Sequence, residues 1–330
     1  MLYEREKQVV INAVTTAAKL CEQVRQEQSS NAISKPDSSP VTIADFGAQA
    51  IICQSLAEAF PHDSVIGEED STLLQSPEMT SLTSQICQYV KKQIPNATPE
   101  SIKDWIDWGN GKVESRYWTL DPIDGTKGYV RGDQYAIALA LVEAGEVKLG
   151  ILGCPSLPVD YKKPNGERGV IFVAVQNQGT TMIPLNGGEP QQIHVTNADE
   201  INSRRLTESV ETQHGNVALQ EEIAQAVGLT SPTLRIDSQA KYGIVARGEA
   251  TLCIRMPFFE YWDRKENTWD HAAGAIVVEE AGGRVTDLYG KPLDYSFGVK
   301  LINNQGIVAS NGAIHEAVLA AIAERIKKQE

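Results

Sequence analysis

The chain has 330 residues, of which 42% are hydrophobic and 22% are charged, and this composition excludes a disordered, collagen-like or coiled-coil protein. Lys and Arg number 30 against 43 Asp and Glu, and the net charge of −13 has the wrong sign for a general binder of nucleic acid or of an anionic membrane. The length fits one large domain or two closely packed ones.

The first predicted element is an amphipathic helix. Apolar residues recur at helical spacing between Val9 and Val24, with Glu, Gln, Lys and Arg between them. The stretch 29–42 is rich in Ser and Pro, which predicts a loop, and apolar periodicity then resumes as far as Phe60. We therefore expect Asp45 where a second helix begins.

Short predicted strands follow. The apolar segment 64–66 leads into the acidic run Gly67-Glu68-Glu69-Asp70. The polar stretch 71–112 contains several prolines and indicates an insertion with one or two short helices. Four further apolar runs, separated by turns that contain Gly, predict strands of a layered α/β or α+β protein: 117–120, 136–142, 148–152 and 169–175.

We expect a domain boundary within 155–164 and set it at 160. Residues 1–160 then form an N-terminal α+β subdomain that carries most of the candidate metal ligands, and residues 161–330 form a C-terminal α/β subdomain with the substrate contacts. In this second part a late helix is predicted to begin at Asp270 and to end at Gly282-Gly283.

The cysteines and the N-terminus indicate the compartment. Five cysteines are scattered along the chain without a C-x-x-C pair, which argues against a disulfide framework and against a zinc ribbon. No basic segment followed by an apolar stretch opens the chain, and the longest apolar run, Ala136–Val142, is far shorter than the ~18 residues that span a bilayer. We expect reduced thiols, no membrane partner and a cytoplasmic location.

Carboxylates are the first candidates for the chemistry, because the common nucleotide-binding and protease signatures are absent from the sequence. Asp121-Pro122-Ile123-Asp124-Gly125-Thr126 follows directly on a predicted strand, and the proline forces an irregular turn that aims Asp124 back toward Asp121. Two converging carboxylates repel each other unless a cation lies between them, and hard oxygen ligands suit Mg²⁺. Taken alone, however, D-x-x-D-G is more often a solvated turn.

Two further acidic elements favour a metal site. Glu68-Glu69 follows a short strand, and Asp270 stands in Trp269-Asp270-His271-Ala272-Ala273-Gly274 at a helix start. Taken alone, either element has an ordinary structural explanation, as part of a surface loop or as the N-cap of a helix. Together, three acidic elements at strand ends and at a helix start are what a two-metal phosphoryl-transfer site requires.

In this order, the three acidic motifs resemble the signatures of the lithium-sensitive, magnesium-dependent phosphatase superfamily, which includes inositol monophosphatase. The resemblance runs from about Val9 to Gly312. Three segments resemble its 3'(2'),5'-bisphosphate nucleotidase branch in particular: Ser39-Pro40-Val41-Thr42 followed by Asp45, Asp124-Gly125-Thr126-Lys127-Gly128-Tyr129, and Asp237-Ser238-Gln239-Ala240-Lys241-Tyr242.

The resemblance implies an α/β (α+β) fold, a layered αβαβα sandwich of the sugar-phosphatase type with the active site in the cleft between the two subdomains. It also implies two or more Mg²⁺ ions. Glu68, Asp121 and the Ile123 carbonyl would hold one ion, and Asp121, Asp124 and Asp270 another, so that Asp121 bridges. Li⁺ would inhibit by replacing the second ion.

The same resemblance assigns catalytic and substrate-binding roles. Asp45 and Thr126 match a water-activating dyad, in which the carboxylate polarises the hydroxyl and the hydroxyl orients and deprotonates the attacking water. A chain with a net charge of −13 needs local cations to bind a bisphosphate, and Arg255 would grip a phosphate bidentately. The implied substrate contacts are Thr126, His214, Ser238, Lys241, Arg255 and Asp270. Of these, a lone histidine such as His214 is more often structural.

The activity that the resemblance implies is removal of the 3'-phosphate from 3'-phosphoadenosine 5'-phosphate to give AMP, with action also on its sulfated form, 3'-phosphoadenosine 5'-phosphosulfate. The cellular context would be sulfate assimilation. Small phosphorylated nucleotides are then the expected partners, inositol bisphosphate stays open as a further substrate, and no nucleic acid is expected.

Two alternatives remain at this point. One is an inositol polyphosphate 1-phosphatase or inositol monophosphatase, against which Thr126-Lys127-Gly128 argues because the monophosphatase pattern has Thr-x-Asn-Phe there. The other is a catalytically dead nucleotide- or metal-binding protein, which should have lost a metal ligand or a member of the dyad, whereas all of these residues are present. The spacing of an EF-hand calcium loop is absent.

Overall fold

The computed structural model describes residues 2–27, 33–34, 40–197, 204–211 and 215–328. Two β-sheets organise the described chain, besides the short pair β1 (Ile33–Ser34) and β2 (Pro40–Val41). The larger sheet has seven strands in chain order, and only its first pair is parallel. Its strands are β3 (Ser64–Gly67), β4 (Arg116–Asp124), β5 (Ala136–Glu143), β6 (Glu146–Pro158), β7 (Arg168–Val175), β8 (Gly179–Pro184) and β9 (Gln191–Ile193).

The second sheet has five strands, in the order β11-β10-β12-β14-β13. In it β10 runs parallel to both of its neighbours, whereas β14 is antiparallel to β12 and to β13. The carboxyl ends of β11, β10 and β12 therefore lie side by side. The strands are β10 (Leu206–Glu208), β11 (Leu234–Arg235), β12 (Leu252–Arg255), β13 (Arg284–Thr286) and β14 (Ile307–Ser310).

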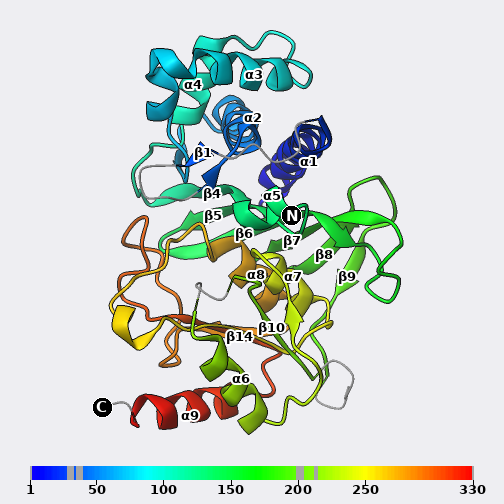
Figure 1. Cartoon of the computed structure of the whole chain (residues 1–330), viewed down its shortest axis with the longest axis vertical. Helices are drawn as coiled ribbons and strands as arrows, with labels where there is room; N and C mark the ends of the chain where they lie inside the picture. The colour runs from blue at the N-terminus through cyan, green and yellow to red at the C-terminus, as the bar shows by residue number, and fades with distance from the viewer. Residues whose placement is uncertain (1, 28–32, 35–39, 198–203, 212–214, 329–330) are drawn as a thin grey trace.

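Helices form three layers around the two sheets (Figure 1). One pair packs on the outer face of the seven-stranded sheet, a second pair lies between the sheets, and a third covers the outer face of the five-stranded sheet. The pairs are, in that order, α1 (Glu4–Glu27) with α2 (Ile43–Ala59), α7 (Ala240–Ala246) with α8 (Ala272–Glu280), and α6 (Val217–Ala226) with α9 (His315–Ile326). The predicted αβαβα sandwich is thereby confirmed.

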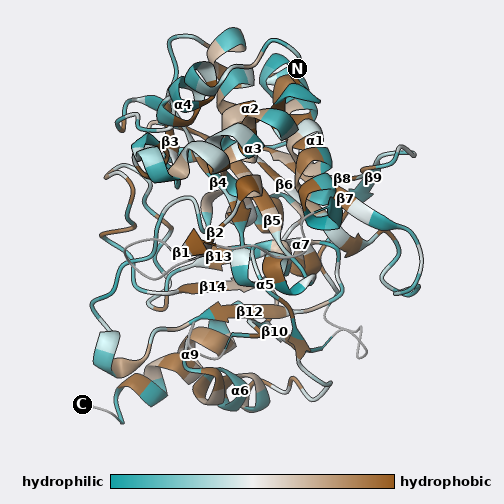
Figure 2. Ribbon diagram, turned by 45° about the horizontal axis from the view of Figure 1, so that its top comes forward, coloured by the Kyte–Doolittle hydropathy of each residue, from teal (hydrophilic) through white to brown (hydrophobic). Residues whose placement is uncertain are grey.

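The apolar patterning explains these layers. The stripe of α1 that faces the sheet is buried, including Val10, Val14 and Cys21, while polar residues occupy its other face (Figure 2). In β5 the residues Ala136–Val142 are all buried, because helices cover both faces of this sheet. Buried hydrophobic clusters fill each gap between layers.

The predicted elements mostly fall where they were expected, with two differences. The insertion 71–112 does contain two short helices, α3 (Thr80–Lys91) and α4 (Pro99–Asp107), and both contact α2. The late helix begins at Ala272 rather than at Asp270, so that Asp270 lies in the turn before it. Strands β7 to β9 continue the first sheet beyond residue 160, so this sheet crosses the position at which we set the boundary, and the boundary itself stays a prediction.

All five cysteines are buried and unpaired. Among the described residues, no helix combines the length and the apolar character that crossing a bilayer requires.

Candidate functional site

A cavity of about 510 Å³ opens between the two sheets. One wall comes from the carboxyl ends of β3 and β4, and the facing wall from the carboxyl ends of β11, β10 and β12 and from the turn before α8. Carboxyl ends of parallel strands are common ligand sites in α/β proteins. The cavity brings together most of the candidate residues of the sequence: Glu68, Asp121, Ile123, Asp124, Thr126, Ser238, Lys241, Arg255 and Asp270.

Strand pairing and a bulge position the acidic side chains. The backbone N–H of Glu68 donates to the Leu120 carbonyl at 3.1 Å, and this continues the parallel β3–β4 ladder and sets Glu68 beside Asp121. The β4–β5 register shifts between Asp121 and Asp124. Residues three apart point to opposite faces of a regular strand, so the extra residue at the bulge allows both carboxylates to face the cavity. Pro122, which lacks an N–H, fits within such a bulge.

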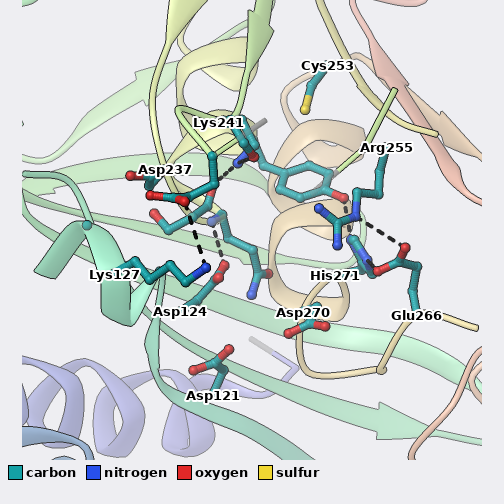
Figure 3. Close-up of a pocket in the computed structure, with 18 of the residues that line it drawn as sticks. Asp121, Asp124, Lys127, Asp237, Lys241, Cys253, Arg255, Glu266, Asp270 and His271 are labelled. Carbon is teal, nitrogen blue, oxygen red and sulfur yellow. Dashed lines mark hydrogen bonds and ion pairs between the residues drawn. The ribbon is translucent and has the colours of Figure 1, made fainter. Parts of the chain in front are cut away.

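Asp121, Asp124 and Asp270 gather on one side of the cavity, with Lys241 and Arg255 across from them (Figure 3). Burial raises the pKa of Asp121 well above its usual value, and the charges of Glu68, Asp124 and Asp270 raise it further. Burial likewise raises the pKa of Asp270 to about 7. These carboxylates repel one another when they are ionised, and a cation between them would remove that repulsion.

The pKa of Asp124 is also raised by burial, but neighbouring groups oppose the shift, among them Lys241 and Gln239. The Lys241 ammonium lies near, and the backbone N–H of Gln239 donates to Asp124 Oδ2 at 2.6 Å. Asp121 Oδ1, by contrast, is buried without a hydrogen-bond partner among the described residues. A buried carboxylate oxygen that no donor satisfies is available to a metal ion.

Asp45 and Thr126 are far apart in sequence and meet in the structure. Asp45 is fully buried in the first turn of α2, where its Oδ2 accepts from the Thr42 N–H at 2.7 Å and from the Thr42 hydroxyl at 2.6 Å. Its other oxygen, Oδ1, lies 3.4 Å from Thr126 Oγ1, and the Ile123 carbonyl lies 3.1 Å from the same hydroxyl, whose one proton can go to either acceptor. The capping box thus fixes one oxygen of Asp45 and leaves the other facing Thr126.

The backbone at Ser238 packs closely against the backbone at Gly125, in the turn that follows β4. A Cβ on Gly125, which has φ +86°, would lie only 2.9 Å from Ser238 Cβ. Ser238 itself has φ +69°, an uncommon conformation for a residue with a side chain. Its carbonyl accepts from Lys241 Nζ at 2.9 Å, and Ser209 Oγ accepts from the same ammonium at 3.2 Å. Lys241 is therefore held with its charge at the cavity.

Arg255 ends β12 and contacts Glu266, whose Oε1 accepts from Arg255 Nε at 3.2 Å. Although burial opposes ionisation of Glu266, its neighbours Arg255 and His271 hold its pKa below the usual range. His271 Nδ1 lies 2.7 Å from the Tyr242 hydroxyl. One donor atom each of Glu266, Asp270 and His271 lie within 4.8 Å of one another, so a cation also fits at this end of the acidic cluster.

Sequence reasoning missed two residues of the site, Gln239 and Glu266. The Gln239 side chain bonds to the turn before α8 and to the start of α8 itself. Its Nε2 donates to the Trp269 carbonyl at 2.8 Å, and its Oε1 accepts from the Gly274 N–H at 3.1 Å. Gln239 stood within a quoted motif, but only the tertiary contacts give it this role, and Glu266 lay in a charged run that carried no signal. His214 and Ser39, which the sequence singled out, lie outside the described residues.

Comparisons with known proteins agree with this geometry. The sequence model of the inositol monophosphatase family matches residues 3–327. The chain is 41% identical to the 3'(2'),5'-bisphosphate nucleotidase of Schizosaccharomyces pombe, over 98% of this chain and 96% of that one. It is 40% identical to the enzyme of the same name from Dictyostelium discoideum, over 97% of both chains.

Solved structures share the fold at low identity. An inositol monophosphatase from Thermotoga maritima superposes with a TM-score of 0.64 at 22% identity, covering 97% of both chains. An inositol monophosphatase from Anabaena (Nostoc) sp. PCC 7120 gives a TM-score of 0.62 at 19% identity, covering 98% of this chain and 97% of the other.

Proposed function

The chain belongs to the inositol monophosphatase family, and on that premise we propose that it hydrolyses the 3'-phosphate of 3'-phosphoadenosine 5'-phosphate to give AMP and phosphate. The observation that carries the proposal is one cavity with a buried carboxylate cluster on one side and Lys241 and Arg255 on the other. A metal-dependent phosphatase needs the carboxylates to bind its metal, and a substrate with two phosphates needs the two cations. The relatives named 3'(2'),5'-bisphosphate nucleotidase support the choice of substrate.

The acidic cluster fits a divalent cation. Asp121 Oδ1 is buried with no hydrogen-bond partner in the described structure, and burial together with like charges raises the pKa of Asp121. We assign the ligands to Glu68, Asp121, Asp124, Asp270 and the Ile123 carbonyl, with Mg²⁺ as the ion that all-oxygen ligands favour. Bound Mg²⁺ would stabilise the negative charge that develops on the phosphoryl group during transfer.

Asp45 and Thr126 together act as the base that deprotonates the attacking water molecule. Thr126 Oγ1 donates its proton toward Asp45 Oδ1, which leaves a hydroxyl lone pair to accept a proton from water at the cavity. Asp45 Oδ2 is occupied by Thr42, so Thr126 is the described hydroxyl that faces the remaining oxygen of Asp45. The proton taken from water passes to this pair as the water oxygen bonds to phosphorus, and the bond from phosphorus to the ribose oxygen breaks while that oxygen takes up a proton from solvent water.

The basic wall would hold the substrate. Lys241 and Arg255 neutralise phosphate charge in a chain whose net charge is otherwise −13. Arg255 is fixed by Glu266 through Nε, and its two terminal nitrogens remain for a bidentate phosphate contact. The sulfated analogue, 3'-phosphoadenosine 5'-phosphosulfate, carries the same 3'-phosphate, so we extend the proposal to it and to a role in sulfate assimilation.

The test is phosphate release by the purified protein from four substrates, each with and without Mg²⁺ and with added Li⁺. We expect Mg²⁺-dependent, Li⁺-inhibited release from 3'-phosphoadenosine 5'-phosphate and its sulfated analogue, and little from inositol 1,4-bisphosphate or inositol 1-phosphate. A preference for the inositol phosphates would keep the metal site and overturn the substrate. No release from any substrate would favour a binding protein without catalysis.

A further inference from the structure

Gln220 is a buried polar residue in the cavity that neither the metal site nor the dyad uses. It lies on α6, where its side chain is 4% exposed, and it lines the cavity together with Val217, one helical turn earlier. Gly215, just before this helix, and Ile254 at the end of β12 line the same region. Gly215, Val217 and Ile254 carry no charge, unlike the residues of the acidic wall.

The Gln220 amide has no hydrogen-bond partner among the described residues, although its backbone N–H is bonded to Asn216 in the helix. Two other buried glutamines are satisfied. Gln239 bonds to two backbone groups and Gln49 to three, on Glu69 and Ile106. Because Gln220 lines the cavity, an amide without a protein partner there is available to a ligand.

Gly215 packs directly against the Gln220 amide. A Cβ on Gly215 would lie 2.8 Å from Gln220 Nε2 and 2.9 Å from the Met256 carbonyl, closer than side-chain atoms normally approach. A larger residue at this position would displace the amide. Two apolar residues, Val217 and Ile254, line the same cavity.

We infer that Gln220 recognises the nucleobase of the substrate, an inference that rests on the proposed function. The phosphates and the ribose carry no aromatic ring, whereas a base presents donors and acceptors on its edge. A glutamine amide offers one donor group and one acceptor in the arrangement that pairs with the N6 and N7 edge of adenine. Gln220 is a specificity residue for the base, set apart from the groups that hold phosphate.

The test compares Gln220→Met, which keeps the volume and removes the amide, with Gln225→Met, a change at an exposed glutamine of the same helix. Two substrates are used: adenosine 3',5'-bisphosphate and its abasic tetrahydrofuran analogue. For Gln220→Met we expect KM for the adenosine compound to rise about ten-fold or more, with kcat within about two-fold and an unchanged KM for the abasic compound. Gln225→Met should change none of these values.

Thermal unfolding separates this role from a structural one. Because the Gln220 amide bonds to no described residue, its removal should leave the Tm of Gln220→Met close to that of the wild type while KM rises. A lower Tm with equal losses on both substrates would overturn the inference, as would an unchanged KM for the adenosine compound. Wild-type protein that releases phosphate from neither compound would instead count against the proposed function itself.

Discussion

At the scale of single residues, Asp121 is under the greatest electrostatic strain in the site, because burial and three neighbouring carboxylates all disfavour its charge. Replacement by Asn keeps its shape and removes that charge. We predict that Asp121→Asn lowers kcat at least about 100-fold, since a direct metal ligand should matter more than the outer-shell groups whose loss costs 10–100-fold. Without metal, the same variant should melt at a higher temperature than the wild type.

Calorimetry in EDTA and phosphate release in Mg²⁺ measure the two effects of Asp121→Asn separately. Retained activity with an unchanged Mg²⁺ dependence would remove Asp121 from the metal site. A lower Tm in EDTA would show that the carboxylate stabilises the fold rather than straining it.

Thr126 allows a second test at this scale, because only its hydroxyl contacts Asp45 and the Ile123 carbonyl. Thr126→Val is close in volume and lacks the hydroxyl, whereas Thr126→Ser keeps it. We predict that kcat falls about 100-fold or more in Thr126→Val, the usual contribution of a positioned base, and far less in Thr126→Ser. Equal losses in the two variants, measured as kcat at saturating substrate, would assign Thr126 to packing instead.

At the scale of elements, Gln239 connects three parts of the fold. Its backbone N–H bonds Asp124 at the end of β4, it precedes α7, and its side chain bonds both sides of the turn that carries Asp270 before α8. These bonds span the cleft between the sheets. Gln239 is therefore expected to set the position of Asp270 relative to Asp124, and so the affinity for the cation.

We predict that Gln239→Leu weakens binding of Mn²⁺, used as a spectroscopic substitute for Mg²⁺, by about 10- to 100-fold, as loss of an outer-shell group does. Electron paramagnetic resonance measures free Mn²⁺ directly and needs no turnover. Asn311→Leu is the matched control, since Asn311 is a buried amide that bonds the backbone and hydroxyl of Thr196 away from the cavity. Both variants lose stability, and equal Mn²⁺ affinities in the two would refute a positioning role.

A second element, α9, is docked through His315 at its start. This side chain is fully buried, with Nδ1 2.9 Å from Ser310 Oγ on β14 and Nε2 2.9 Å from Thr286 Oγ1 on β13. Burial lowers the pKa of His315 to about 4, and the Arg284 cation adds to the shift. Between pH 6.5 and 4 the unfolded chain therefore takes up a proton at this residue that the folded chain does not.

It follows that stability is lost as the pH falls through this window, by up to about 3 kcal/mol from His315 alone. His315→Gln should lose less free energy of unfolding between pH 7 and 4.5 than the wild type does, as measured by urea denaturation at each pH. His194→Gln, at an exposed histidine, should keep the wild-type slope. If His315→Gln keeps that slope as well, the buried imidazole is not the acid-sensitive group.

At the scale of the whole molecule, local patterns in the sequence predicted the layers and the acidic motifs. The αβαβα architecture is confirmed, and Glu68, Asp121, Asp124 and Asp270 line one cavity, because strand ends and helix starts follow from short-range periodicity. The roles of the individual site residues stay predictions. Contacts such as that of Gln239 with Trp269 could not be predicted from the sequence, because they join segments that meet only in the folded chain.

The last strands of the first sheet likewise could not be assigned from local sequence patterns. Strands β8 and β9 are short and partly exposed, and nothing in their local pattern tells which sheet they extend. Only the pairing of β8 with β7 and of β9 with β8 assigns them to the first sheet. Edge strands are fixed by a partner that the local sequence does not name.

The central claim is that one cavity holds a cation in its acidic wall and a nucleoside bisphosphate against its basic wall, where water attacks the 3'-phosphate and the ribose 3'-oxygen is the leaving group. The most direct measurement is ³¹P NMR of adenosine 3',5'-bisphosphate with the purified protein and Mg²⁺. We predict that the 3'-phosphate resonance disappears as free phosphate grows, while the 5'-phosphate resonance of AMP persists, and that EDTA stops the change. Loss of the 5'-phosphate instead, or a rate that is the same in EDTA, would contradict the account.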